Sequence, residues 1–169
     1  MVVAKAVRRA AEQLVVLGDA GNASDEDLEG ACGDVSMVFA QMIDKVDCYE
    51  EGDFTEEDSY DVAHCWVRLD DEVWDLTATQ LVDFVPDVTD VFVTNGDERY
   101  VTKFKGKKAY KSLCVGYYSS NFGGIIDGWG DSEWRIRLKE RAKAVLEYYL
   151  SLPVGCVVNE NHKDDGHHG

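Results

Sequence analysis

Apolar side chains recur at helical spacing near both ends of the chain. In the opening stretch this spacing predicts an amphipathic helix that ends at Gly18 and carries Arg8 on its polar side. The same spacing begins after Ser132, a typical helix-capping residue, and stops before Pro153. A third helix is predicted to begin at Cys32, and its apolar positions leave little polar surface. We therefore expect this third helix to be central and buried.

Strand patterns fill the middle of the chain. Residues 60–69 alternate two sets of side chains, as a strand does. Asp70 and Asp71 then turn the chain, and residues 72–76 are predicted to return as an antiparallel strand. We expect residues 77–84 to continue as a shorter strand that ends near Pro86.

A second hairpin is predicted further on. Asn95-Gly96 is a strong hairpin turn signal, and it separates two candidate strands at 90–94 and 98–104. The segments 18–31 and 47–59 are rich in turn residues and in acidic residues respectively, so both are predicted to be loops.

These elements indicate a single α+β domain. Helices come first and last with hairpins between them, a pattern typical of an antiparallel sheet with helices packed on one face. We expect the domain to span residues 1–155, and the polar residues 156–169 to form a disordered tail.

Composition and charge narrow the class of protein. The chain has 169 residues, 45% of them hydrophobic, which suits a packed core and not a disordered chain. Its 17 basic and 33 acidic side chains give a net charge of −16, so its surface repels nucleic acid and anionic lipid. No apolar run approaches the roughly 20 residues that cross a bilayer. We expect a cytoplasmic protein that binds a protein or peptide substrate, with no nucleic acid, membrane or cofactor as partner.

Among the cysteines, Cys32 has the position of a nucleophile. The chain holds five cysteines and no CxxC pair, which favours a reducing compartment. Cys32 stands at a predicted helix start, between Gly30 and Gly33. The N–H groups and the positive dipole end found there stabilise a thiolate and can also bind an oxyanion.

His64 and Asp75 are predicted to meet across the first hairpin. With a two-residue loop, Leu69 pairs with Glu72 and Trp66 faces Asp75, which places Asp75 diagonal to His64 on the same face. A three-residue loop would move Asp75 to the opposite face, so the hypothesis depends on the register.

Together these residues meet the needs of acyl transfer to sulfur. Cys32 supplies a thiolate, His64 an imidazole that exchanges its proton, and Asp75 an acid that orients the ring. Trp66 and Trp74 would shield the pair from water, and we assign them no catalytic role.

Three runs, GACGDVSMVFAQMI, AHCWV and EVWDLTATQL, resemble the papain-like, transglutaminase-like superfamily of cysteine enzymes. The resemblance covers roughly residues 30–80. It implies a central helix bearing Cys32, packed on an antiparallel sheet, with Cys32, His64 and Asp75 as the catalytic triad. It also implies peptide hydrolysis, deamidation or transglutamination through a thioester.

The chain also departs from the papain pattern. It lacks the CGSCW signature, and no glutamine a few residues before Cys32 completes an oxyanion hole. The third triad member is an aspartate where papain-type enzymes have asparagine. Gln13, Asn22 and Gln80 remain as alternative amide donors.

Other interpretations follow from the same residues. The spacing of Cys32, Cys48, His64 and Cys65 does not suit zinc, so no metal is expected. Cys65 alternates with His64 along its strand and is expected to be a buried hydrophobic residue, as are Cys48, Cys114 and Cys156. The charge of −16 leaves open an acidic binding or inhibitor protein that mimics nucleic acid, or a docking module whose triad no longer turns over.

Overall fold

The computed structural model describes residues 1–21, 23, 28–45, 49–54, 62–81, 89–95 and 132–153. Within them the protein is α+β, as the sequence predicts. The helices and strands, in chain order, are α1 (Val2–Val16), α2 (Cys32–Met42), β1 (Tyr49–Phe54), β2 (Val62–Leu69), β3 (Glu72–Asp75), the 3-10 helix η2 (Ala78–Leu81), β4 (Phe92–Asn95) and α4 (Glu133–Ser151).

The strands form one antiparallel sheet in the order β1-β2-β3-β4. Between β2 and β3, Leu69 pairs with Glu72 and Val67 with Trp74. This confirms the predicted two-residue turn and its register. Asp70, the first residue of the turn, has φ +53°, a conformation that aspartate tolerates better than most side chains.

Strand β1 corrects one sequence-based expectation. The acidic segment 47–59 was predicted to be a loop, but Tyr49–Phe54 pairs with β2 over its whole length. β1 lies at one end of the sheet, where charged side chains are tolerated because they discourage pairing with other chains. Acidic composition therefore did not exclude a strand here.

The segment after β3 corrects another. Residues 77–84 were predicted to continue as a strand, but the chain turns into η2 instead. The carboxylate of Asp75 accepts hydrogen bonds from the backbone N–H and the hydroxyl of Thr77, at 2.8 and 3.2 Å. Such a local bond competes with strand pairing and starts a turn.

The second predicted hairpin is described in part. β4 matches the first candidate strand, and its residues pair with β3. The turn at Gly96, the strand at 98–104 and the tail at 156–169 lie outside the described residues.

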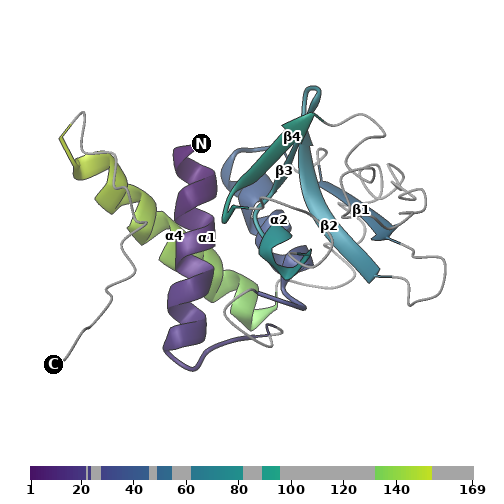
Figure 1. Ribbon diagram of the computed structural model, residues 1–169. Coiled ribbons are helices and arrows are strands. Elements are labelled where there is room, and N and C mark those ends of the chain that lie inside the picture. The colour runs from purple at the N-terminus through teal and green to yellow at the C-terminus, as the bar shows by residue number, and fades with distance from the viewer. Residues whose placement is uncertain are drawn as a thin grey trace, which may run out of the picture.

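α2 lies between the sheet and the pair formed by α1 and α4 (Figure 1). As predicted, its side chains are buried almost all round, with Val35, Val38 and Phe39 at most 2% exposed. Ser132 caps α4 by accepting a hydrogen bond from the N–H of Arg135, so the predicted start of that helix is confirmed. None of the described helices is long and apolar enough to cross a membrane.

A buried ion pair joins α2 to α4. The guanidinium of Arg135 donates from Nε and Nη2 to Oδ1 of Asp34, both at 2.9 Å. Both residues are under 9% exposed. Because Asp34 stands in the first turn of α2, this pair also fixes the helix end that carries Cys32.

Gly21 makes a close approach that only glycine permits. Its φ is +57°, and a Cβ built there would collide with the ring of Trp134. We expect Gly21→Ala to lower the free energy of unfolding by more than the roughly 1–2 kcal/mol of left-handed strain alone. Chemical denaturation measures the loss. Gly18→Ala is the control, since Gly18 has φ +81° with open space around it; equal losses in the two variants would contradict the collision.

Candidate functional site

Cys32 is the first residue of α2, as the sequence predicts. The preceding Gly30 has φ +85°, which turns the chain into the helix. The side chain of Cys32 is partly exposed, whereas the rest of this helix face is buried. A thiol at this point lies beside the first-turn N–H groups and remains open to reagents.

His64 and Asp75 form a fully buried pair. Nε2 of His64 lies 2.6 Å from Oδ2 of Asp75, and both side chains are 0% exposed. The other oxygen of Asp75 is held by Thr77. The carboxylate is thereby fixed, and it fixes the ring of His64 in turn.

The ring of His64 also contacts Cys32. Each imidazole nitrogen carries one proton or one lone pair, and Asp75 occupies Nε2. Nδ1 therefore remains for the hydrogen bond to the sulfur of Cys32, which influences the pKa of both residues. The structure thus brings together all three residues that the sequence proposed as a site.

These contacts shift the pKa values of Cys32 and His64 in the directions that favour a thiolate–imidazolium ion pair. Burial by itself lowers the pKa of His64, but the charge of Asp75 and its hydrogen bond, with those of Cys32, outweigh it and raise that pKa to about 10. A hydrogen bond from Cys65 is the largest influence on Cys32. Together with the bond and charge of His64 it overcomes burial and lowers the pKa of Cys32 to about 5.

The contact between Cys65 and Cys32 was missed from the sequence. Cys65 is buried, as expected, at 5% exposed. Its side chain nevertheless packs on Met37 with Cys32 beside it, and it hydrogen-bonds the sulfur of Cys32. Because side chains alternate along β2, Cys65 and His64 point to opposite faces of the sheet. This alternation does not predict which of the two contacts α2.

Gln80 is the candidate amide donor that reaches the site. Its Nε2 lies 3.0 Å from Nδ1 of His64 and donates to the carbonyl of Thr77, also at 3.0 Å. Gln13 instead accepts a hydrogen bond from Arg141 between α1 and α4. Asn22 lies outside the described residues.

Gln80 and Cys32 compete for Nδ1 of His64. The carbonyl of Thr77 fixes the nitrogen end of the Gln80 amide, so Gln80 presents a donor to the ring. A donor suits the neutral imidazole, whereas the imidazolium presents its own proton to the sulfur of Cys32. Formation of the ion pair therefore requires the amide of Gln80 to give way.

We expect Gln80→Met to lower the pKa of Cys32 further, because the neutral ring loses a partner. One hydrogen bond contributes about 1 kcal/mol, so the shift stays below about one pKa unit. The midpoint of iodoacetamide labelling against pH, followed by mass spectrometry, measures it. Gln41→Met serves as the matched control, since Gln41 bonds Lys139 on α4. A midpoint that moves to higher pH would contradict the competition.

Arg8 braces the segment that carries Asp75 and Gln80. Although it was assigned to the polar side of α1, it is only 4% exposed. Its Nη1 donates to the carbonyl of Leu76 at 2.8 Å and to the hydroxyl of Thr79 at 3.0 Å. The site is thus tied to the first helix as well as to α2.

Trp66 covers the buried histidine. Its ring centroid lies 6.2 Å from that of His64, and it is 1% exposed. Trp74 packs instead against Phe39, with centroids 6.0 Å apart. Of the two tryptophans expected to shield the site, Trp66 is the one that lies near the ring, tilted by 35° to it.

Three further cysteines and the candidate metal ligands complete the comparison with the sequence. Cys48, Cys114 and Cys156 lie outside the described residues. In the part of the chain that the structure describes, no three His, Cys, Asp or Glu side chains are grouped to hold a metal ion.

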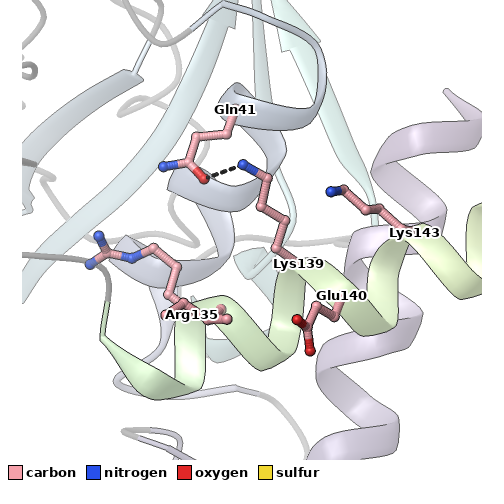
Figure 2. Close-up of a pocket in the computed structure, with 6 residues that line it drawn as sticks. Gln41, Arg135, Lys139, Glu140 and Lys143 are labelled. Carbon is pink, nitrogen blue, oxygen red and sulfur yellow. Dashed lines mark hydrogen bonds between the residues drawn. The ribbon is translucent and has the colours of Figure 1, made fainter.

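A separate hollow of about 210 Å³ lies where α4 meets α2. Figure 2 shows Lys139 reaching across it to Gln41, with a hydrogen bond of 3.2 Å. Its lining is mainly cationic and comprises Gln41, Arg135, Ile136, Lys139, Glu140 and Lys143. None of these is a nucleophile of the kind found at the head of α2, so we assign the hollow no part in the chemistry.

Comparisons of the chain with protein-family models, with curated proteins and with solved structures give no match.

Proposed function

We propose that this protein is a thiol-dependent hydrolase or acyltransferase with a papain-like core, acting on a peptide or amide bond. One observation carries the proposal: the continuous hydrogen-bonded series from Asp75 through His64 to Cys32. Cysteine enzymes need a thiolate, an imidazole in reach of it and a group that orients the ring. The antiparallel sheet packed on the helix that bears Cys32 supports the same interpretation.

The proposed reaction begins with the thiolate of Cys32 attacking the carbonyl carbon of the substrate. The oxyanion that develops is stabilised by the first-turn N–H groups of α2 and by the amide of Gln80, which leaves Nδ1 when the ion pair forms. His64 then gives its Nδ1 proton to the leaving amine, and an acyl thioester remains on Cys32. Water or a second amine attacks the thioester, with His64 as base.

The pH range of activity follows from the two pKa values. The thiolate–imidazolium pair exists above the pKa of Cys32, about 5, and below that of His64, about 10. The two groups titrate as a pair, so these are limits of the pair's stability range. We expect the acylation rate to rise through the lower limit and to fall through the upper one.

The test uses p-nitrophenyl acetate as a generic acyl donor. We expect a burst of nitrophenolate and one acetyl group on Cys32, identified by peptide mass spectrometry. Cys32→Ala should abolish both while leaving the thermal midpoint close to that of the unchanged protein. Acetylation of another cysteine first, or an equal burst from Cys32→Ala, would overturn the proposal.

A further inference from the structure

Cys32 and Cys65 are held side by side by two independent contacts between α2 and β2. Ser36 stands one helical turn after Cys32, so both lie on the same face of α2. The hydroxyl of Ser36 donates to the carbonyl of Cys65 at 3.0 Å, which fastens residue 65 to that face. Cys65 and Met37 pack together against Cys32.

Cys32 packs against the cluster of Cys65 and Met37, and both cysteines are reduced in this structure. Cys32 is partly exposed, whereas Cys65 is buried. A partly exposed thiolate is oxidised first, to a sulfenic acid. A buried thiol beside it can then attack the oxidised sulfur and form a disulfide. In the acyl-transfer chemistry proposed above, Cys65 influences the pKa of Cys32 but forms no bond to the substrate.

We propose that Cys65 is a resolving thiol and that a hydroperoxide converts Cys32 and Cys65 into a reversible disulfide. Formation of the bond needs only the two thiols. Its consequence, that the site is switched off while Cys32 is protected from irreversible oxidation, rests on the proposed function.

The reaction balances in two steps. The thiolate of Cys32 attacks one oxygen of the hydroperoxide, so that an S–O bond forms, the O–O bond breaks, and the departing hydroxide or alkoxide takes a proton from His64. The sulfur of Cys65 then attacks the sulfur of Cys32, forming the S–S bond and releasing the hydroxyl, which leaves as water with the proton of Cys65. Both sulfurs are oxidised and the peroxide is reduced. Two external thiols reverse the result.

Hydrogen peroxide in small molar excess, enough for two successive oxidations of one thiol per chain, tests this on the full chain. The protein is reduced, freed of reductant, oxidised, then alkylated under denaturing conditions and digested. We expect a cross-linked pair of peptides containing Cys32 and Cys65, lighter than the reduced peptides by two hydrogen atoms and split by dithiothreitol. In Cys65→Ser the cross-link should be lost, and the sulfinic acid of Cys32 should accumulate in its place. Cys156→Ser, the matched single-cysteine control, should retain the cross-link.

Two results would overturn the inference: a disulfide between Cys32 and a different cysteine, or sulfinic acid at Cys32 in the unchanged protein with Cys65 still reduced. Mapping the unchanged protein decides the question even where Cys65→Ser does not fold. The readout does not involve acyl transfer. If the cross-link forms but nitrophenyl acetate leaves no acetyl group on Cys32, the proposed function fails and this inference stands.

Discussion

Replacing Asp75 by asparagine is expected to slow acetylation of Cys32 by about 10²- to 10⁴-fold, the range attributed to a positioned acid–base group. The amide preserves the shape of the side chain but removes the charge that lies 2.6 Å from His64. The pKa of His64 then falls, because burial still lowers it and Cys32 alone remains to raise it. With the imidazolium lost, the pKa of Cys32 rises, and iodoacetamide labelling near pH 6 should slow as well.

Glu72→Gln is the matched control, because it removes the same charge from the exposed start of the same strand. We expect the rate of acetylation and the pH profile of labelling to remain as in the unchanged protein. Equal effects of Asp75→Asn and Glu72→Gln would mean that net charge, and not contact with His64, sets the reactivity of Cys32.

Arg135→Met is expected to cost about 3–5 kcal/mol of unfolding free energy, because it removes the guanidinium that compensates the buried charge of Asp34. In a domain of this size the thermal midpoint should fall by roughly 10 °C. Circular dichroism during heating measures the change. The double variant Asp34→Leu/Arg135→Met should recover most of the loss, since no buried charge remains unpaired.

Arg137→Met provides the comparison on the same helix. Arg137 pairs with Asp19 at 2.5 and 2.9 Å, but its side chain is 45% exposed. Water screens an exposed pair, so it contributes little to stability and this variant should unfold within a few degrees of the unchanged protein. A loss as large as that of Arg135→Met would show that burial is not what makes the inner pair important.

The parts of the site that depend on local sequence could be predicted. Whether Asp75 shares a face with His64 depends only on side-chain alternation and on the number of residues in one turn, so the register could be predicted and was correct. The start of α2 could also be predicted from the local sequence, since the helical spacing of apolar residues begins at Cys32. The approach of Cys32 to His64 came from the needs of the chemistry and from a resemblance, because no local pattern links the two.

The features that were missed depend on distant partners or on single side-chain bonds. Arg8 reads as a polar residue of a helix until Leu76 and Thr79 are known to lie against it. The hydroxyl of Ser36 holds residue 65 against α2, and the alternation of side chains along β2 does not reveal this contact. Helix η2 replaces a strand because the carboxylate of Asp75 accepts a hydrogen bond from the N–H of Thr77, two residues later, which residue propensities do not predict.

The hydrogen bonds from Arg8 limit how much of the chain can be removed without disturbing the site. A fragment spanning residues 28–95 would contain the three proposed catalytic side chains and every strand that the structure describes. It would still lack Arg8, whose guanidinium donates a hydrogen bond to the carbonyl of Leu76, 68 positions later in the sequence. A minimal version with the proposed activity must therefore keep α1, and a protease that removes that helix should abolish the acetylation of Cys32 without cutting near its sulfur.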